Sequence, residues 1–438
     1  MSSWLGKVLY PANVADLDAA LDEFLRHPLA SDTDTLDALI GGMEEWALQM
    51  DARVGNDVGL PFLKTWWRRS QLRSVLRHEF GNNAPQGPLD ISVSLSERSW
   101  APLGTVLHWP AGNVPIQPLL SLTGGILAGN RNIVRVPSAL LNFVESLLRI
   151  APASAAPVLE RVVFVSFPSE RLDLGKACAA RSDGAMIWGG EEAVTSVRSL
   201  GFPHWARLHV FGPRVSVAMG LLDLHTLSQP VELQRLCRRL ARETWQFDQQ
   251  ACSSPLALYV EVADDAARSA GGKAAALKQL VEALAEAFAA EERAHPRVDF
   301  DFRASVDVLL SRSRWLVDND GAHAVLPDGP AWSLLYGGMD DWVPSPVHGK
   351  TLHIVSAARL EEIAARLDGS TQTIGIWIHD AQREAAIART AHAKGVDRVV
   401  RIGLMHVFNT PWDGQELVRP LCRHVHFIPT RTESPANE

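Results

Sequence analysis

Cys252 is the cysteine whose setting suits a nucleophile. It lies in the short polar segment FDQQACSSP, which runs into the apolar stretch LALYVEV. A reactive cysteine must be accessible and must have neighbours that favour the thiolate, and a polar loop meets the first condition. Cys237 lies instead in the amphipathic segment LQRLCRRL, and Cys178 and Cys422 also have helix-like neighbours, a setting typical of small packed side chains. From the loop alone, Cys252 could be either a nucleophile or a small packed side chain.

Asn113 is a second residue that could take part in chemistry. It lies on a turn in LHWPAGNVPIQPLLSLTGGILAGNRNIVRVPS, between a strand that ends at Trp109 and a helix rich in small residues. A side-chain amide on such a turn could stabilise the oxyanion of a tetrahedral intermediate, a contribution of roughly 3–4 kcal/mol in well-studied enzymes. The alternative is that Asn113 only shapes the turn.

The segments around these two residues predict an α/β fold with parallel sheets. Short runs typical of strands alternate with stretches long enough for one helix and two loops, a pattern that favours parallel strands with crossover helices. Such a sheet binds ligands beyond the carboxyl ends of its strands. Helices are expected over residues 229–246 and 264–292. The predicted strands are GTVLHW, NIVRV, RVVFVSF, GAMIW and RLHVF in the first half, and LALYVEV, VDVLL, TLHIV, TIGIWI and RVVRI in the second.

The predicted secondary structure divides the chain into three regions. Residues 1–90 read as helical and end near the turn-forming segment GNNAPQGPLD, which we take as a boundary. Residues 91–215 form a first α/β domain, on which residues 405–438 are expected to pack back. Residues 216–404 form a second α/β domain, which carries Cys252.

Composition excludes several classes of protein. The 438 residues carry a formal net charge of −8 with no basic block, so nucleic acid is not an expected partner. The four cysteines are far apart and form no CxxC pair, which argues against disulfides and structural zinc. His424 and His426 share a strand face but have no evident third ligand, so no metal is predicted. No apolar run reaches the ~20 residues of a membrane span, and the N-terminus lacks a signal peptide's apolar core. A cytoplasmic enzyme is expected.

The order of these segments resembles the aldehyde-dehydrogenase superfamily. WPAGNVP, GGILAGN and IVRVPS resemble its cofactor-binding stretch, and FDQQACSSP resembles its catalytic-cysteine loop. With WGGEEAV and FGPRVS, the resemblance narrows to the fatty acyl-CoA reductases of the bacterial luminescence (LuxC) family. It runs from about residue 100 to 262, with weaker similarity in GVDRVVRIG and TPWDG. It implies an aldehyde-dehydrogenase-like fold, in which residues 91–215 are the Rossmann-like cofactor domain and residues 216–404 the catalytic domain.

The resemblance also implies roles for individual residues. Cys252 is the expected nucleophile, and Asn113 with the backbone N–H of Cys252 forms the expected oxyanion hole. Gly189 and Gly190 lie where the pyrophosphate of the nicotinamide cofactor is expected, at a helix N-terminus that suits an anion. The full set of expected cofactor-binding residues is Trp109, Arg135, Pro137, Ser138, Gly189, Gly190 and Gly212.

The sequence departs from the oxidising aldehyde dehydrogenases at one position. Those enzymes carry a glutamate shortly before a Gly-Gly-Lys, and this glutamate activates the water that hydrolyses the acyl-enzyme. In the matching segment RLHVFGPRVS, Val210 takes its place, or His209 if the alignment shifts by one residue. Without that base, water should attack a Cys252 thioester slowly, whereas a thiol can still enter or leave.

The resemblance therefore implies NADPH-dependent reduction of a fatty acyl thioester to the aldehyde through a Cys252 acyl-enzyme, with coenzyme A or a carrier protein as acyl donor. NADPH is favoured over NADH, partly from the family, because the planar fork of Arg135 could pair with a 2′-phosphate; the alternative is that Arg135 is a structural surface arginine. A homo-oligomer, and membership of an acyl-transfer complex, are also implied. Three alternatives stay open: an oxidising aldehyde dehydrogenase, a cysteine acyltransferase that needs no nicotinamide, and an acyl-carrying subunit of a multi-enzyme complex.

Overall fold

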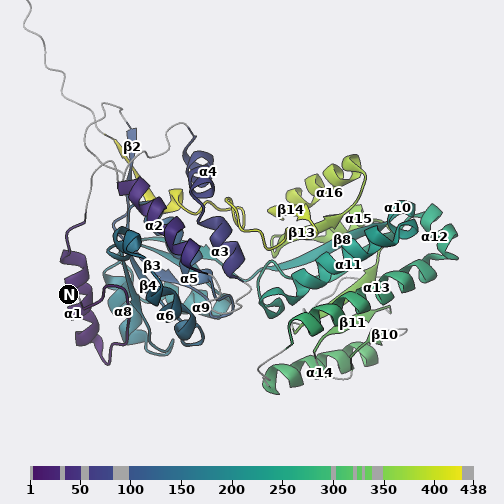
Figure 1. Cartoon of the computed structure of the whole chain (residues 1–438), viewed down its shortest axis with the longest axis horizontal. Helices are drawn as coiled ribbons and strands as arrows, with labels where there is room; N and C mark the ends of the chain where they lie inside the picture. The colour runs from purple at the N-terminus through teal and green to yellow at the C-terminus, as the bar shows by residue number, and fades with distance from the viewer. Residues whose placement is uncertain are drawn as a thin grey trace, which may run out of the picture. The chain divides into compact units, whose positions relative to one another are not determined.

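The protein folds as two compact units (Figure 1). Unit 1 comprises residues 1–212 and 408–438, and unit 2 comprises residues 213–407. Most of the expected boundary segment GNNAPQGPLD lies outside the described residues, as does the tail beyond residue 426. This computed structural model describes residues 3–29, 35–50, 59–81, 98–296, 302–318, 323–327, 331–337 and 349–426.

Unit 1 contains a six-stranded sheet in which every adjacent pair of strands is parallel. Its central strands are buried on both faces, as expected for apolar runs in a parallel sheet. All five strands predicted for the first half are confirmed. In sheet order the strands are β1 (Val8–Leu9), β5 (Val162–Val165), β4 (Arg131–Arg135), β3 (Thr105–Trp109), β6 (Gly184–Trp188) and β7 (Arg207–Phe211).

The small residues of α5 (Gln117–Leu127) allow this helix to approach the sheet closely. A Cβ atom at Gly125 would come within 1.9 Å of Oδ1 of Asn132. That oxygen lies 2.9 Å from Nε2 of the buried His108, whose Nδ1 lies 2.8 Å from Oγ of Ser121. Burial lowers the pKa of His108 to about 4, so the ring is neutral; Nε2 donates to Asn132, and Nδ1 accepts from Ser121. These bonds fix α5 against β3 and β4.

The remaining helices of unit 1 cover this sheet and extend the unit at its N-terminal end. A further short strand, β2 (Arg98–Pro102), lies outside the six-stranded sheet. The helices are α1 (Val14–Arg26), α2 (Thr35–Gln49), α3 (Leu60–Trp66), α4 (Arg69–Phe80), α6 (Leu141–Arg149), α7 (Ala156–Leu159), α8 (Leu172–Ala180) and α9 (Glu191–Arg198).

Residues 408–426 return to unit 1 and are held there by Glu79 of α4. The buried carboxylate accepts hydrogen bonds from Oγ1 of Thr410 at 2.6 Å and from the backbone N–H groups of Leu417, Val418 and Arg419 at 2.8–2.9 Å. The strand β15 (Cys422–His426) then pairs antiparallel with β2. A buried carboxylate is tolerated only where donors of this kind compensate its lost hydration.

Unit 2 contains a seven-stranded sheet that is parallel except for its edge pair β10–β11. Four of the five strands predicted here are confirmed, and three strands of the sheet, β8, β10 and β11, were not predicted. In sheet order the strands are β10 (His323–Val325), β11 (Ser333–Tyr336), β12 (Thr351–Ser356), β9 (Pro255–Val262), β8 (Val215–Leu222), β13 (Thr371–Trp377) and β14 (Arg398–Arg401).

The predicted strand VDVLL is wrong, because these residues lie in the helix α14 (Phe302–Asp318). Val308 and Arg312 are buried, whereas Leu309 and Leu310 are exposed, which is helical spacing. A short apolar run cannot be assigned to a strand or a helix by its composition alone.

Helices cover both faces of the sheet in unit 2. On one face α11 (Pro230–Trp245) packs beside α13 (Lys273–Ala294), and on the other lie α15 (Leu360–Arg366) and α16 (Ala381–Ala393). The predicted helix over 264–292 is in fact two, because Gly271 and Gly272 have φ values of +86° and +128° and end α12 (Asp264–Ala270). None of the described helices is both long enough and apolar enough to cross a bilayer.

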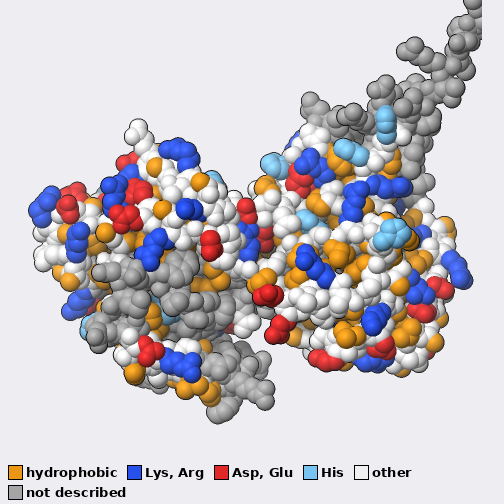
Figure 2. Space-filling model, turned by 180° about the vertical axis from the view of Figure 1, so that it is seen from behind, with side chains coloured by type: hydrophobic (Ala, Val, Ile, Leu, Met, Phe, Trp, Pro, Cys, Tyr) orange, Lys and Arg blue, Asp and Glu red, His pale blue; other side chains and the backbone are white. Residues whose placement is uncertain are grey.

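Charged side chains of both signs are interspersed on the face shown in Figure 2. Among all the described residues, several charged side chains are paired, for example Arg181 with Asp18 at 2.7 Å, and Arg383 with Glu261 at 2.8 Å. A nucleic-acid backbone requires a continuous basic surface, and the described residues on this face do not form one.

Candidate functional site

The loop that carries Cys252 begins with an unusual backbone. Phe247, Asp248 and Gln249 have φ values of 53°, 52° and 61°, a left-handed conformation that costs non-glycine residues free energy and needs support from its surroundings. The buried side chain of Gln249 supplies that support. Its Nε2 donates to the carbonyl oxygens of Pro255 and Thr351 at 2.9 and 2.7 Å, and its Oε1 accepts from the N–H of Thr351 at 2.9 Å. Gln249 thus anchors the loop to the starts of β9 and β12.

Two side chains hold Cys252 itself. Oγ of Ser216 donates to the carbonyl oxygen of Cys252 at 2.7 Å, and Nε2 of Gln372 donates to its Sγ at 3.1 Å. Gln372 lies where the pairing of β13 with β8 is irregular, between Thr371 and Thr373. Irregularities of this kind re-aim side chains next to functional sites. A hydrogen bond to sulfur favours the thiolate over the thiol.

The residue after Cys252 is fixed by a buried histidine. Oγ of Ser253 lies 2.8 Å from Nδ1 of His406, and Nε2 of His406 lies 2.8 Å from the carbonyl oxygen of Glu243 in α11. Burial lowers the pKa of His406 to about 4, so the ring is neutral. Since a carbonyl oxygen can only accept, Nε2 carries the proton, and Nδ1 accepts from Ser253. His406 therefore holds the loop in place and does not act as a base there.

The other three cysteines have a different setting. Cys178, Cys237 and Cys422 are buried, and burial raises the pKa of each thiol to about 12. Cys252 is only half-buried. A nucleophile must be reachable, and Cys252 is the most accessible of the four cysteines.

In unit 1, the residues expected to bind the cofactor follow the carboxyl ends of four parallel strands. Trp109 ends β3, Arg135 ends β4, Gly189 follows β6, and Gly212 follows β7. The strands β3 and β6 are neighbours in the sheet although β4 and β5 separate them in sequence. A parallel sheet binds its ligands at such a switch point. The structure therefore brings these residues to the edge where a nucleotide site is expected.

Arg135 is buried between two aromatic rings. Its guanidinium carbon lies 5.0 Å from the ring centre of Trp109 and 6.0 Å from that of Phe167, and Nη2 donates to the carbonyl oxygen of Phe167 at 3.2 Å. Its buried Nε has no hydrogen-bond partner among the described residues. Pro137 is buried and lies 3.5 Å from the position a Cβ atom would take at Gly112, while Ser138 is exposed. Arg135 thus retains donor capacity toward an anion, although aromatic packing holds most of the side chain.

Gly189 and Gly190 form the junction between β6 and α9. Gly189 has a φ of +158° and donates its N–H to the carbonyl oxygen of Phe211 at 3.2 Å, which ties the ends of β6 and β7 together. A Cβ atom at Gly190 would meet no other atom within 4 Å, so there is room for a phosphate at the start of α9. The first turn of this helix also carries Glu191 and Glu192, and these carboxylates partly offset the positive end of the helix dipole.

Asn113 lies exposed on the turn between β3 and α5. The turn is shaped by Gln117, whose Oε1 accepts from the N–H of Ala111 at 2.7 Å. Asn113 belongs to unit 1 and Cys252 to unit 2. The position compared with the missing glutamate lies on β7, where Val210 and His209 are both partly buried and burial lowers the pKa of His209.

Comparison with known proteins identifies the family. The sequence profile of the family described as acyl-CoA reductase (LuxC) matches residues 47–424. The chain belongs to the LuxC family. The long-chain acyl-protein thioester reductase of Vibrio harveyi is 25% identical over 341 residues, which cover 75% of this chain and 64% of the relative. The corresponding enzyme of Aliivibrio fischeri is 22% identical with the same coverage. This LuxC-family chain therefore spans less than two thirds of the length of those relatives.

Solved structures show the fold of this LuxC-family chain. An aldehyde dehydrogenase from Brucella melitensis biovar abortus 2308 superposes with a TM-score of 0.64 at 14% identity, covering 94% of this chain and 88% of the other. The lactaldehyde dehydrogenase of Escherichia coli gives a TM-score of 0.60 at 13% identity, covering 94% and 90%. The aldehyde-dehydrogenase-like fold predicted from the sequence motifs is confirmed.

Sequence reasoning missed the residues that support Cys252 in this LuxC-family chain. Gln372, Ser216 and His406 lie 120, 36 and 154 positions away from Cys252 in the sequence and reach its loop only through the sheet. One weak sequence signal points to Gln372, which is a polar residue directly before the predicted strand TIGIWI. No comparable signal marks His406.

Glu243 makes the stability of unit 2 depend on pH. Its Oε1 accepts from the N–H groups of Gly403 and Met405 at 2.8 and 2.6 Å, and its buried Oε2 has no partner among the described residues. Burial raises the pKa of this carboxyl from 4.5 to about 7. Between these two values the folded chain keeps a proton that the unfolded chain has released, so the contribution of Glu243 to stability is greatest below pH 4.5 and falls as the pH rises toward 7.

We expect Glu243→Gln to remove this dependence. The unfolding free energy of the wild type, relative to that of the variant, should fall by roughly 3 kcal/mol between pH 4.5 and 7. Urea denaturation followed by tryptophan fluorescence at a series of pH values measures the difference. Parallel pH profiles for the two proteins would contradict the prediction.

Proposed function

We propose that this protein reduces an acyl thioester to the aldehyde, with the acyl group held on Cys252 during the reaction. The observation that carries the proposal is the setting of Cys252 in a chain of the LuxC family: half-buried, on a backbone fixed by Gln249 and Ser216, with an amide N–H of Gln372 directed at its sulfur. The names of the relatives, acyl-protein thioester reductases, support the same reaction.

The first step is attack by the Cys252 thiolate on the carbonyl carbon of the acyl thioester. A carbon–sulfur bond forms to Cys252, the bond to the donor thiol breaks, and the donor leaves as a thiolate that takes a proton from solvent. Gln372 favours the thiolate before attack, because its amide donates to Sγ. The Asn113 amide is proposed to donate to the oxyanion of the tetrahedral intermediate.

When bound, a nicotinamide cofactor would supply the hydride that reduces the acyl carbon of the Cys252 thioester. The bond between that carbon and Sγ then breaks, which releases the aldehyde and returns Cys252 as a thiolate. The same oxyanion donor serves both halves of the cycle, because the carbonyl oxygen becomes negatively charged in each.

We propose that unit 1 binds this cofactor at the carboxyl ends of β3, β4, β6 and β7. Gly189 and Gly190 would face the pyrophosphate, where the open space at Gly190 supports close approach. Trp109, Pro137 and Ser138 would line the adenosine side, and Gly212 would lie at the far strand end. The unpartnered Nε of Arg135 supports NADPH over NADH, because a 2′-phosphate would give this buried donor an acceptor.

Replacement of the usual glutamate by Val210 favours reduction over oxidation. An oxidising aldehyde dehydrogenase must hydrolyse its acyl-enzyme, and that step needs a base to activate water. Val210 lies on β7 and offers no titratable group, and the adjacent His209 is largely desolvated. A thioester on Cys252 is therefore expected to persist until the hydride arrives.

The proposal is tested by following NADPH absorbance with a panel of acyl thioesters of increasing chain length. The same acyl groups should be offered on coenzyme A and on the phosphopantetheine arm of a carrier protein, because the family description and the names of the relatives point to different donors. Consumption of NADPH with formation of aldehyde supports the reductase, and the better donor identifies the substrate. Acylation of Cys252 with no NADPH consumed on either donor would overturn it in favour of an acyltransferase or acyl-carrying subunit.

A further inference from the structure

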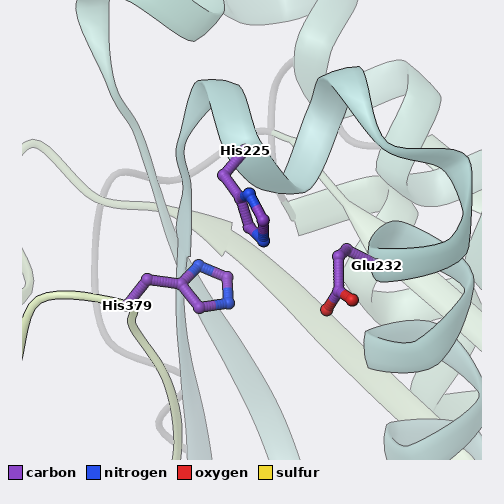
Figure 3. A group of neighbouring side chains, drawn as sticks. All are labelled: His225, Glu232 and His379. Atoms are coloured by element: carbon purple, nitrogen blue, oxygen red, sulfur yellow. The ribbon is translucent and has the colours of Figure 1, made fainter.

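Two histidines and a glutamate of unit 2 direct their side chains toward one another (Figure 3). His225 lies in the short helix α10 (Leu224–Ser228), Glu232 in the first turn of α11, and His379 directly after β13. One ligand atom from each of the three lies within 4.8 Å of the other two. Both histidines are exposed, and Glu232 is partly buried, so an ion from solvent can reach the cluster.

Each histidine is oriented through its other ring nitrogen. Nδ1 of His379 lies 3.0 Å from Oδ2 of Asp223, and Nδ1 of His225 lies 2.9 Å from the side-chain amide of Gln229. Because a carboxylate only accepts, Nδ1 of His379 carries the proton, and the lone pair of the neutral ring lies on Nε2. At His225 the facing atom is Nε2 of Gln229, which donates to Nδ1. His225 would offer Nε2 to a metal once this amide rotates and presents its oxygen to Nδ1 instead. A carboxylate or amide behind the histidine is the usual support of a metal-binding imidazole.

Local contacts fix the backbone around the cluster. Asp223 caps α10 by accepting from the N–H of Thr226 at 2.7 Å, and Gln229 is the single residue that joins α10 to α11. These contacts fix His225 and Glu232 on either side of the joint. One group competes with a cation, since Oε1 of Glu232 accepts from Nη1 of Arg235 at 2.6 Å. The other carboxylate oxygen of Glu232 can still coordinate a metal ion, and the hydrogen bond from Arg235 would then hold the carboxylate in place.

We propose that His225, Glu232 and His379 bind a divalent first-row transition metal of the zinc class. Zn²⁺ is commonly coordinated tetrahedrally by nitrogen and oxygen ligands. The cluster would supply two imidazole nitrogens and one carboxylate oxygen, and water would take the fourth position. Hard cations such as Mg²⁺ and Ca²⁺ prefer oxygen ligands and fit this set poorly. The ion would join the end of β13 to the α10–α11 joint and stabilise the folded state of unit 2.

Calorimetric titration of the full-length chain with Zn²⁺ tests the proposal. We expect one site per chain in the wild type, and loss of that site in both His225→Gln and His379→Gln. The matched control is His295→Gln. His295 is also exposed and lies 3.8 Å from the carboxylate of Glu291, but it is not part of the cluster, so this variant should bind Zn²⁺ as the wild type does. Asp223→Asn keeps a residue able to cap α10 but loses the charge behind His379, and should weaken binding by about 10- to 100-fold.

Cobalt identifies the ligands independently. Co²⁺ bound at this cluster should give the visible bands of a tetrahedral nitrogen and oxygen site, without the charge-transfer band of a cobalt–thiolate bond. Equal binding of Zn²⁺ to the wild type and to both histidine variants would overturn the proposal. A thiolate band that persists in those variants would do the same, because it would assign the ion to a cysteine.

Discussion

Cys252→Ala is expected to abolish aldehyde formation while binding of the nicotinamide nucleotide is retained. The substitution removes the only atom to which the acyl group is proposed to be attached, so both halves of the cycle are lost. The residues proposed to bind the nucleotide all lie in unit 1, whereas Cys252 lies in unit 2, so the substitution should not disturb the fold around the nucleotide site. Steady-state turnover with an acyl thioester measures the first effect, and nucleotide titration measures the second.

The matched control is Cys237→Ala, which removes a buried thiol from α11. That variant should keep its turnover, because Cys237 is a packing residue, and the change should appear only as a modest loss of stability. Labelling with a radioactive acyl thioester gives a second measure: the wild type and Cys237→Ala should retain acyl label, and Cys252→Ala should not. Substantial turnover by Cys252→Ala would show that another group carries the acyl chain.

Asn113→Ala is expected to lower turnover by a factor of about a hundred or more, as the loss of one oxyanion donor does in other enzymes. The loss should fall mainly on kcat, because the amide is proposed to donate to an oxygen that becomes charged only in the transition state. Single-turnover measurements of acyl transfer to Cys252 and of hydride transfer should both slow, since both steps pass through an oxyanion.

Asn113→Asp separates this role from turn shaping. Aspartate suits such a turn as well as asparagine does, but its carboxylate cannot donate a hydrogen bond and would repel an oxyanion. We expect Asn113→Asp to be at least as slow as Asn113→Ala, with unchanged thermal stability. Wild-type turnover in Asn113→Asp would assign Asn113 to the turn alone.

Five of the six strands of the sheet in unit 1 could be predicted from the sequence because they are short apolar runs, most of them buried on both faces, whereas β1 has only two residues. The segments NIVRV and GAMIW have no competing helical period. The segment VDVLL does have one, because its buried Val308 lies four residues before the buried Arg312, whereas Leu309 and Leu310 are exposed. The strand β8 was not predicted because VSVAMGLL contains only two β-branched residues, and its continuous apolar run suits a buried helix as well as a buried strand.

The nucleophile and its loop could be inferred from sequence, but the groups that hold them could not. The role of Gln372 depends on an irregular pairing of β13 with β8, and such a register cannot be read from composition. His379 meets His225 and Glu232 only because β13 lies beside β8 in the sheet. The sequence pattern suggested His424 and His426 as a possible pair of metal ligands. In the structure, the ring centre of His424 lies 3.6 Å from that of Trp100, so this histidine packs against an aromatic ring.

The return of residues 408–426 to unit 1 makes unit 2 an insertion within the other unit. During synthesis from the N-terminus, every strand of the seven-stranded sheet therefore leaves the ribosome before residues 408–426, which complete unit 1. Until then Glu79 lacks its four donors, and β2 lacks its partner strand. Since domains generally fold as units during synthesis, unit 2 can be finished first, although unit 1 is begun first.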